Sequence, residues 1–126
     1  MSRTTEIVIY AAPDDQDRLE ELSFWLRDQA PRSNDRSDGP ACYLLPLDPD
    51  SFGGFKNPAS RLWAGVANHL ALAAFVDHLA EIGWGHPESV QALVMDEGDP
   101  YFRIYMLQDG KPVQLAPVPD TAELPW

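Results

Sequence analysis

Residues 90–107 read VQALVMDEGDPYFRIYML. Two apolar segments, 90–95 and 101–107, are rich in the β-branched and aromatic residues that favour strands. The residues between them, DEGDP at 96–100, are typical of a tight turn. The stretch therefore predicts a β-hairpin.

The flanking residues extend this hairpin and supply a helix before it. QDGK at 108–111 predicts a second turn into a strand at 112–115. Residues 70–83 place five apolar side chains within one sector of a helix: Leu72, Phe75, Val76, Leu79 and Ile82. Asp77 and Glu81 lie on the opposite side, and Gly83 is a natural C-cap.

The first half of the chain repeats the combination of strand and helix. Residues 6–12 predict a buried strand, and residues 14–28 a helix with an apolar stripe of Leu19, Leu22 and Leu26. Pro31 ends that helix. Residues 41–47 predict a second strand whose Pro46 marks a sheet edge, and residues 61–68 a third strand.

The predicted element order is β-α-β-β-α-β-β-β. We therefore expect an α+β fold with a mainly antiparallel sheet and two helices on one face, ferredoxin-like or a related sandwich. The length of 126 residues predicts a single domain, 1–126. It carries a polar loop at 31–40 and an extended, proline-rich C-terminal tail at 116–126.

The charge is the unusual feature of the composition. Twenty acidic residues face nine basic ones, a formal net charge of −11. Phosphate groups would be repelled, which argues against binding to DNA, RNA or an anionic membrane and favours a basic protein as partner. No apolar stretch reaches the length of a membrane span, and the single cysteine cannot form an internal disulfide, so we expect a cytoplasmic protein.

No motif indicates a reaction. His69, His78 and His86 are nine and eight residues apart, whereas a metal pair on one helix needs a spacing of three or four. Cys42 lies in a predicted strand and is interpreted as a small buried hydrophobe. Phosphate-binding loops and nucleophile elbows are absent from the sequence. We expect neither catalysis nor a metal or other cofactor.

The most distinctive surface is the predicted helix at 14–28, which has six acids and two bases, a local net charge of −4. Five residues project away from the leucine stripe and form the candidate partner-binding site: Asp17, Glu20, Glu21, Phe24 and Asp28. An aromatic anchor with a polar rim is typical of a binding hot spot. The alternative is that the helix is rotated and Phe24 belongs to the core.

Two other aromatic groups allow different interpretations. Phe52, Phe55 and Trp63 form a second candidate patch, for which core packing is the preferred explanation. A pocket lined by Tyr43, Trp63, His69 and Tyr105 would suit the alternative function of a small ligand-binding or enzymatic ferredoxin-like dimer. A secretion adaptor or structural subunit is a third alternative. The sequence also allows the chain to form a homo-oligomer.

The C-terminal half resembles bacterial immunity proteins of polymorphic and contact-dependent toxin systems. The resemblance covers about a third of the chain: the helix end EIGW at 81–84, HPESVQ at 86–91, and the strand pair 92–95 and 101–106. It implies a non-catalytic protein that binds and neutralises a cognate toxin in the producing cell. It assigns no role to individual residues.

Overall fold

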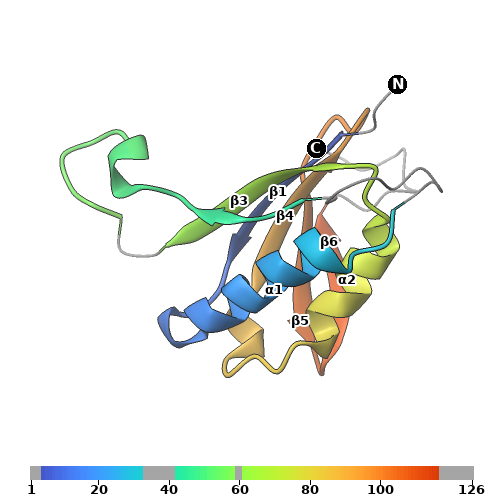
Figure 1. The fold of residues 1–126 in the computed structure, drawn as a ribbon. Coiled ribbons are helices and arrows are strands. Elements are labelled where there is room, and N and C mark those ends of the chain that lie inside the picture. The colour runs from blue at the N-terminus through green and yellow to red at the C-terminus, as the bar shows by residue number, and fades with distance from the viewer. Residues whose placement is uncertain (1–3, 33–41, 59–60, 117–126) are drawn as a thin grey trace.

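The computed structural model describes residues 4–32, 42–58 and 61–116 (Figure 1). Its sheet strands are β1 (Thr4–Tyr10), β2 (Leu45–Pro46), β3 (Leu62–Asn68), β4 (Gln91–Asp96), β5 (Arg103–Gln108) and β6 (Lys111–Ala116). The α-helices are α1 (Gln16–Asp28) and α2 (Leu72–Glu81), and the short 3-10 helices are η1 (Pro13–Asp15), η2 (Pro49–Ser51) and η3 (Pro87–Ser89). The predicted order of strands and α-helices is confirmed.

The strands form one six-stranded sheet in the order β2-β3-β1-β4-β5-β6, and every neighbouring pair is antiparallel. β1 and β2 run parallel with β3 between them, and β3 and β4 run parallel with β1 between them. These are two split β-α-β units, as in a ferredoxin-like fold, and the hairpin β5-β6 extends the sheet beyond β4. The predicted α+β class is confirmed.

Both α-helices cover the same face of the sheet (Figure 1). The leucine stripe of α1 is completely buried, and Phe75 and Leu79 of α2 are buried beside it. They pack against Ile7 and Ile9 of the central strand in one core cluster. Fully burying such side chains contributes about 1.5–3 kcal/mol each, so this layer is the main source of stability.

The second hairpin forms as its turn residues predict. Asp109 and Gly110 both have positive φ, 53° and 76°. A two-residue turn that follows the twist of a hairpin requires this conformation at both positions, and Asp-Gly is among the pairs that adopt it most readily. β5 and β6 therefore pair directly, from Gln108 opposite Lys111 onward.

The second strand is much shorter than predicted. Of the range 41–47, only Leu45–Pro46 pairs with β3, and residue 41 lies outside the described part. The backbone N–H and C=O of Leu44 bond instead to the Ser23 hydroxyl of α1. Pro46 has no N–H to donate. Pro46 does lie in the edge strand of the sheet, as predicted.

The predicted glycine cap of the second helix is wrong. α2 ends at Glu81, Ile82 is extended, and Gly83 is not among the glycines with positive φ. The indole Nε1–H of buried Trp84 instead donates to Leu79 O at 2.8 Å. This bond satisfies a carbonyl of the last helical turn, a role that a left-handed glycine often fills.

The core assignment of the second aromatic patch is partly wrong. Phe52 and Phe55 are not core residues, because both are exposed on the loop around η2, which projects from the sheet (Figure 1). Trp63 is buried, as expected.

Residues 33–40 of the predicted polar loop and residues 117–126 of the predicted tail lie outside the described residues. No helix in the described part is long and apolar enough to cross a membrane.

A buried carboxylate joins the two helical segments. Asp15 immediately precedes α1 and is only 2% exposed. Its two oxygens accept the backbone N–H of Gly85 at 2.7 Å and of His86 at 2.9 Å, beyond the end of α2. Hydrogen bonds from N–H groups to a charged acceptor are stronger than neutral ones. Asp15 therefore anchors the start of α1 to the loop before β4.

We predict that Asp15→Ala lowers the free energy of unfolding by about 2–3 kcal/mol, because two N–H donors lose their acceptor. Urea denaturation followed by circular dichroism measures the change. Asp14→Ala is the matched control, since the Asp14 side chain is 86% exposed, and it should cost less than about 0.5 kcal/mol. Equal losses in the two variants would show that Asp15 is not an anchor.

Candidate functional site

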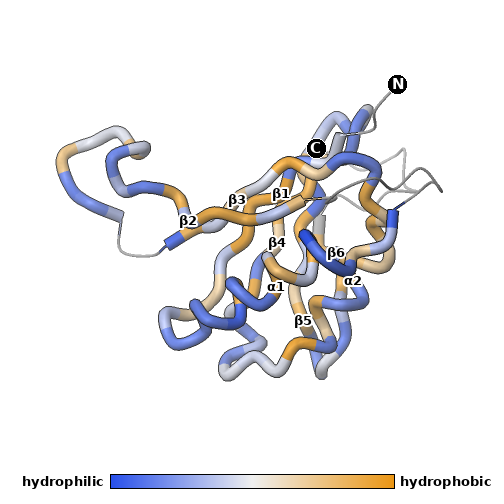
Figure 2. The backbone as a smooth tube through the Cα atoms, viewed as in Figure 1, coloured by the Kyte–Doolittle hydropathy of each residue, from blue (hydrophilic) through white to orange (hydrophobic). Residues whose placement is uncertain are grey.

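Burial of the leucine stripe turns the opposite side of α1 toward solvent. All five predicted partner-binding residues are exposed there: Asp17, Glu20, Glu21, Phe24 and Asp28. Phe24 is 49% exposed, which decides against the alternative that it belongs to the core. The helix carries hydrophilic residues along much of its length in Figure 2, whereas the central strands are hydrophobic.

The five residues share one groove. It has a volume of about 650 Å³ and lies between α1 and the C-terminal end of α2. We call it the acidic groove; besides the five it is lined by Arg18, Trp25, Gln29, His78, Glu81, Ile82 and Gly83. Glu81, contributed by α2, adds a carboxylate that the sequence reasoning did not include.

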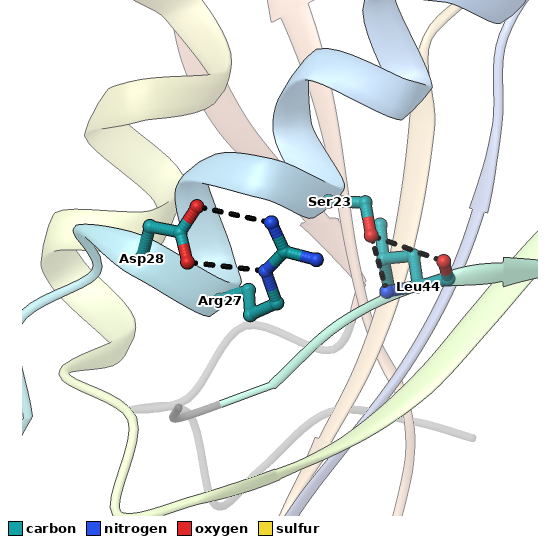
Figure 3. A network of polar contacts seen from close by, with 4 residues as sticks. All are labelled: Ser23, Arg27, Asp28 and Leu44. Atoms are coloured by element: carbon teal, nitrogen blue, oxygen red, sulfur yellow. Dashed lines mark hydrogen bonds and ion pairs between the residues drawn. The ribbon is translucent and has the colours of Figure 1, made fainter. Parts of the chain in front are cut away.

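The acidic groove keeps unneutralised carboxylates. Arg18 lies 3.6 Å from Glu21, and Arg27 binds both oxygens of Asp28 at 3.0 and 3.2 Å (Figure 3). The second pair lowers the pKa of Asp28 through its hydrogen bonds. Within the described residues, the acidic side chains that lack an ion pair in this groove are Asp17, Glu20 and Glu81. A cationic ligand would meet charges that are still free.

An aromatic stack forms part of the groove wall. The rings of Trp25 and His78 lie 4.0 Å apart and only 7° from parallel. Burial lowers the pKa of His78, against the opposing influence of Glu81 and Glu21. The imidazole is therefore neutral at neutral pH and does not offset the acidic charge. It ties α2 to α1 as a packing element.

A second groove lies on the other side of Phe24. It has a volume of about 390 Å³ and runs between α1 and residues 43–46 at the sheet edge. We call it the apolar groove; its lining residues are Glu20, Ser23, Phe24, Arg27, Tyr43, Leu44, Leu45, Pro46 and Trp63. Phe24 and Glu20 line both grooves. The Arg27 guanidinium lies 4.9 Å from the centre of the Phe24 ring, within cation–π range.

The sequence reasoning did not include Tyr43 and Leu45 in the partner-binding set, although they are 55% and 58% exposed beside Phe24. The available signal is the alternation along 42–45. Cys42 and Leu44 are buried, so the two apolar residues between and after them point outward. A short strand with apolar residues on both faces predicts a second contact surface.

Ser23 holds this exposed segment against α1 (Figure 3). Its hydroxyl donates to Leu44 O at 3.0 Å and accepts from Leu44 N–H at 2.8 Å. Gly65 of β3 leaves room on the other side, since a Cβ there would collide with the Tyr43 carbonyl oxygen. The Ser23 bonds also occupy backbone groups at the sheet edge, which limits pairing with a foreign strand.

The structure does not assemble the alternative ligand pocket. Tyr43 and Trp63 line the apolar groove, whereas Tyr105 is buried in β5, beyond β1 and β4 in the sheet order. His69 is not among the lining residues of that groove. No group of three or more His, Cys, Asp or Glu among the described residues is arranged to hold a metal ion.

Comparisons with known proteins add no relative. No family model matches the chain, and neither the curated proteins nor the solved structures contain a significant match.

We predict that Ser23→Ala lowers the free energy of unfolding by about 1–2 kcal/mol, because both backbone groups of Leu44 lose their partner. Amide hydrogen exchange should accelerate at Leu44 in particular. Ser51→Ala, on the exposed η2 turn, is the matched control and should change neither measurement. Unchanged exchange at Leu44 in Ser23→Ala would contradict the proposed clamp.

Cys42 is predicted to be a poor nucleophile. Burial raises the pKa of its thiol from 9.0 to about 11, so the reactive thiolate is scarce at pH 8. Alkylation by iodoacetamide at pH 8 should be about 100-fold slower in the folded protein than in urea, following the thiolate fraction. Similar rates in the two states would show an accessible, activated thiol.

Proposed function

We propose that this chain is a non-catalytic binding protein that holds a basic partner protein on α1, in the manner of a toxin-neutralising immunity protein. The observation that carries the proposal is the half-exposed Phe24 between the acidic groove and the apolar groove.

Phe24 has the properties of a binding anchor. It lies on a helix fixed by buried leucines, so its backbone loses little freedom on binding. Tyr43 and Leu45 give it apolar neighbours across the apolar groove. Burial of an aromatic side chain at the centre of an interface commonly contributes about 2 kcal/mol or more to the free energy of binding. This cluster supplies the apolar part of a protein interface.

The surrounding charge favours a basic partner. Asp17, Glu20 and Glu81 carry free carboxylates in the acidic groove, and the whole chain has a net charge of −11. Complementary charge accelerates encounter and discriminates against acidic partners. Lysine or arginine side chains beside an apolar residue are the chemistry that these grooves fit.

The assignment of the partner as a toxin domain rests on the resemblance of residues 81–106 to immunity proteins, and not on the grooves. Such a protein protects the producing cell, so the proposed site of action is the cytoplasm. Neutralisation requires only that a tight complex covers the toxin's active site. No reactive group of this chain is needed, in keeping with the buried thiol of Cys42.

The test is affinity capture from the native host with four versions of the chain, followed by mass spectrometry. The wild type should retain a basic protein, and Phe24→Ala and the double variant Glu20→Lys/Glu21→Lys should each lose it at least about tenfold. The control Asp50→Lys/Asp77→Lys makes the same charge change at exposed positions outside both grooves and should retain it.

The captured protein is then purified and titrated with the chain. Inhibition of its toxicity at one-to-one stoichiometry supports the immunity role, and binding should weaken as salt rises. An acidic partner, or capture that is equal for all four versions, contradicts the proposal. Melting temperatures close to the wild type are required of each variant, because a large loss of stability would place these side chains in the core.

A further inference from the structure

The face of the sheet opposite the helices is also apolar. Antiparallel sheets with one solvated face usually alternate apolar and polar residues along each strand. Here β1 contains IVIY at 7–10, β4 contains ALVM at 92–95 and β5 contains IYML at 104–107. Such continuous apolar runs are typical of strands that are covered on both faces. Both described α-helices nevertheless lie on one face.

The strand register shows how these side chains line up. Directly paired residues share a face, so Leu45, Ala64, Val8, Leu93 and Ile104 form a central row across five strands. A row on one side consists of Val66, Glu6 and Met95, and a row on the other of Leu62, Tyr10, Gln91, Met106 and Val113. We call these three rows the open face.

None of the side chains of the open face is buried, and Val66 is 64% exposed. Glu6 is the charged residue of the open face, and it lies outside the central row. Polar Tyr10 and Gln91 lie in the other flanking row. An apolar centre with polar groups toward the rim is the anatomy of a protein interface.

We propose that the open face is the contact surface of a homodimer, in which a second copy of this chain packs sheet against sheet. Two copies with a net charge of −11 each repel one another wherever their charged surfaces meet. The open face carries one carboxylate among its residues, so it allows contact with little repulsion. A basic partner would find few charges to pair with there and is better matched by the acidic groove.

The size of the open face suits a two-fold contact. The three rows hold 13 residues, on five, three and five strands, and each residue takes up roughly 32 Å² of the sheet face, so the footprint is roughly 400 Å². Two copies then cover roughly 800 Å², which is the size of a weak, reversible interface. A two-fold axis along the central row places that row on its symmetry mate and sets Glu6 of one copy opposite Tyr10 of the other, so the two carboxylates do not face each other.

The open face shares Leu45 with the apolar groove but does not include Phe24, and the proposed dimer does not depend on the proposed function. In a dimer of this kind the helices lie on the outside and the acidic groove remains accessible, whereas the apolar groove loses access to Leu45. A chain that dimerises but binds no basic partner would support the dimer alone. A monomer that binds the partner would support the proposed function alone.

Sedimentation equilibrium of the full chain tests the proposal directly. A dimer has a mass of 2 × 14.1 kDa, or 28.2 kDa. We expect the dimer to form as the protein concentration is raised to about 100 μM. The melting temperature should rise with protein concentration. A mass of 14.1 kDa throughout this range, with a melting temperature independent of concentration, overturns the proposal.

Variants locate the interface. Leu93→Glu puts a carboxylate in the central row and should weaken dimerisation at least about 100-fold, while Ile104→Gln should weaken it about tenfold. Phe24→Glu is the matched control on α1 and should leave the dimer intact. Circular dichroism checks that each variant is folded. If Leu93→Glu does not fold, Ile104→Gln provides the measurement of dimerisation.

Two other results would overturn the assignment. If the dimer survives both sheet variants and is broken by Phe24→Glu, the interface lies on α1. If the wild type is a monomer whose Val8 and Leu93 methyl groups contact residues 117–126, the chain itself occupies the open face.

Discussion

The rotation of α1 about its axis is the constraint on which the surface of this protein depends. Leu19, Leu22 and Leu26 are completely buried against the sheet, and a helix that buries these positions must expose the residues between them. Turning α1 to bury Phe24 would lift leucines out of the core, at a cost of about 1.5–3 kcal/mol for each. The exposed acidic and aromatic side is therefore a direct consequence of core packing.

The fold presents two surfaces of different chemistry. On the helix side, carboxylates surround a single exposed phenylalanine, and electrostatic attraction can select a basic partner. On the open face of the sheet, apolar rows carry almost no charge, and contact there is driven by burial of apolar area. The two surfaces lie on opposite layers and share Leu45 at the sheet edge, so a protein of this size can use the acidic groove and the open face at once.

Much of the fold follows from the sequence, because periodicity is a local property. The apolar stripes of both α-helices, the Asp-Gly turn before β6 and the edge position of Pro46 were all predicted correctly. The errors arose where a distant group took over a local role. Ser23 bonds the backbone of Leu44 and shortens β2, and the Trp84 indole bonds a carbonyl at the end of α2, where a glycine cap was expected.

The sequence by itself determined the α+β class, the excess of negative charge and the set of five residues on the outer side of α1, since these depend on composition and on spacing along one element. Only the tertiary structure decided that Phe24 is exposed, that Glu81 joins the same groove, and that Tyr43 and Leu45 adjoin Phe24. Strand order and register likewise brought the apolar row from Leu45 to Ile104 onto one face. These are contacts between residues far apart in the chain, and no local pattern encodes which of them meet.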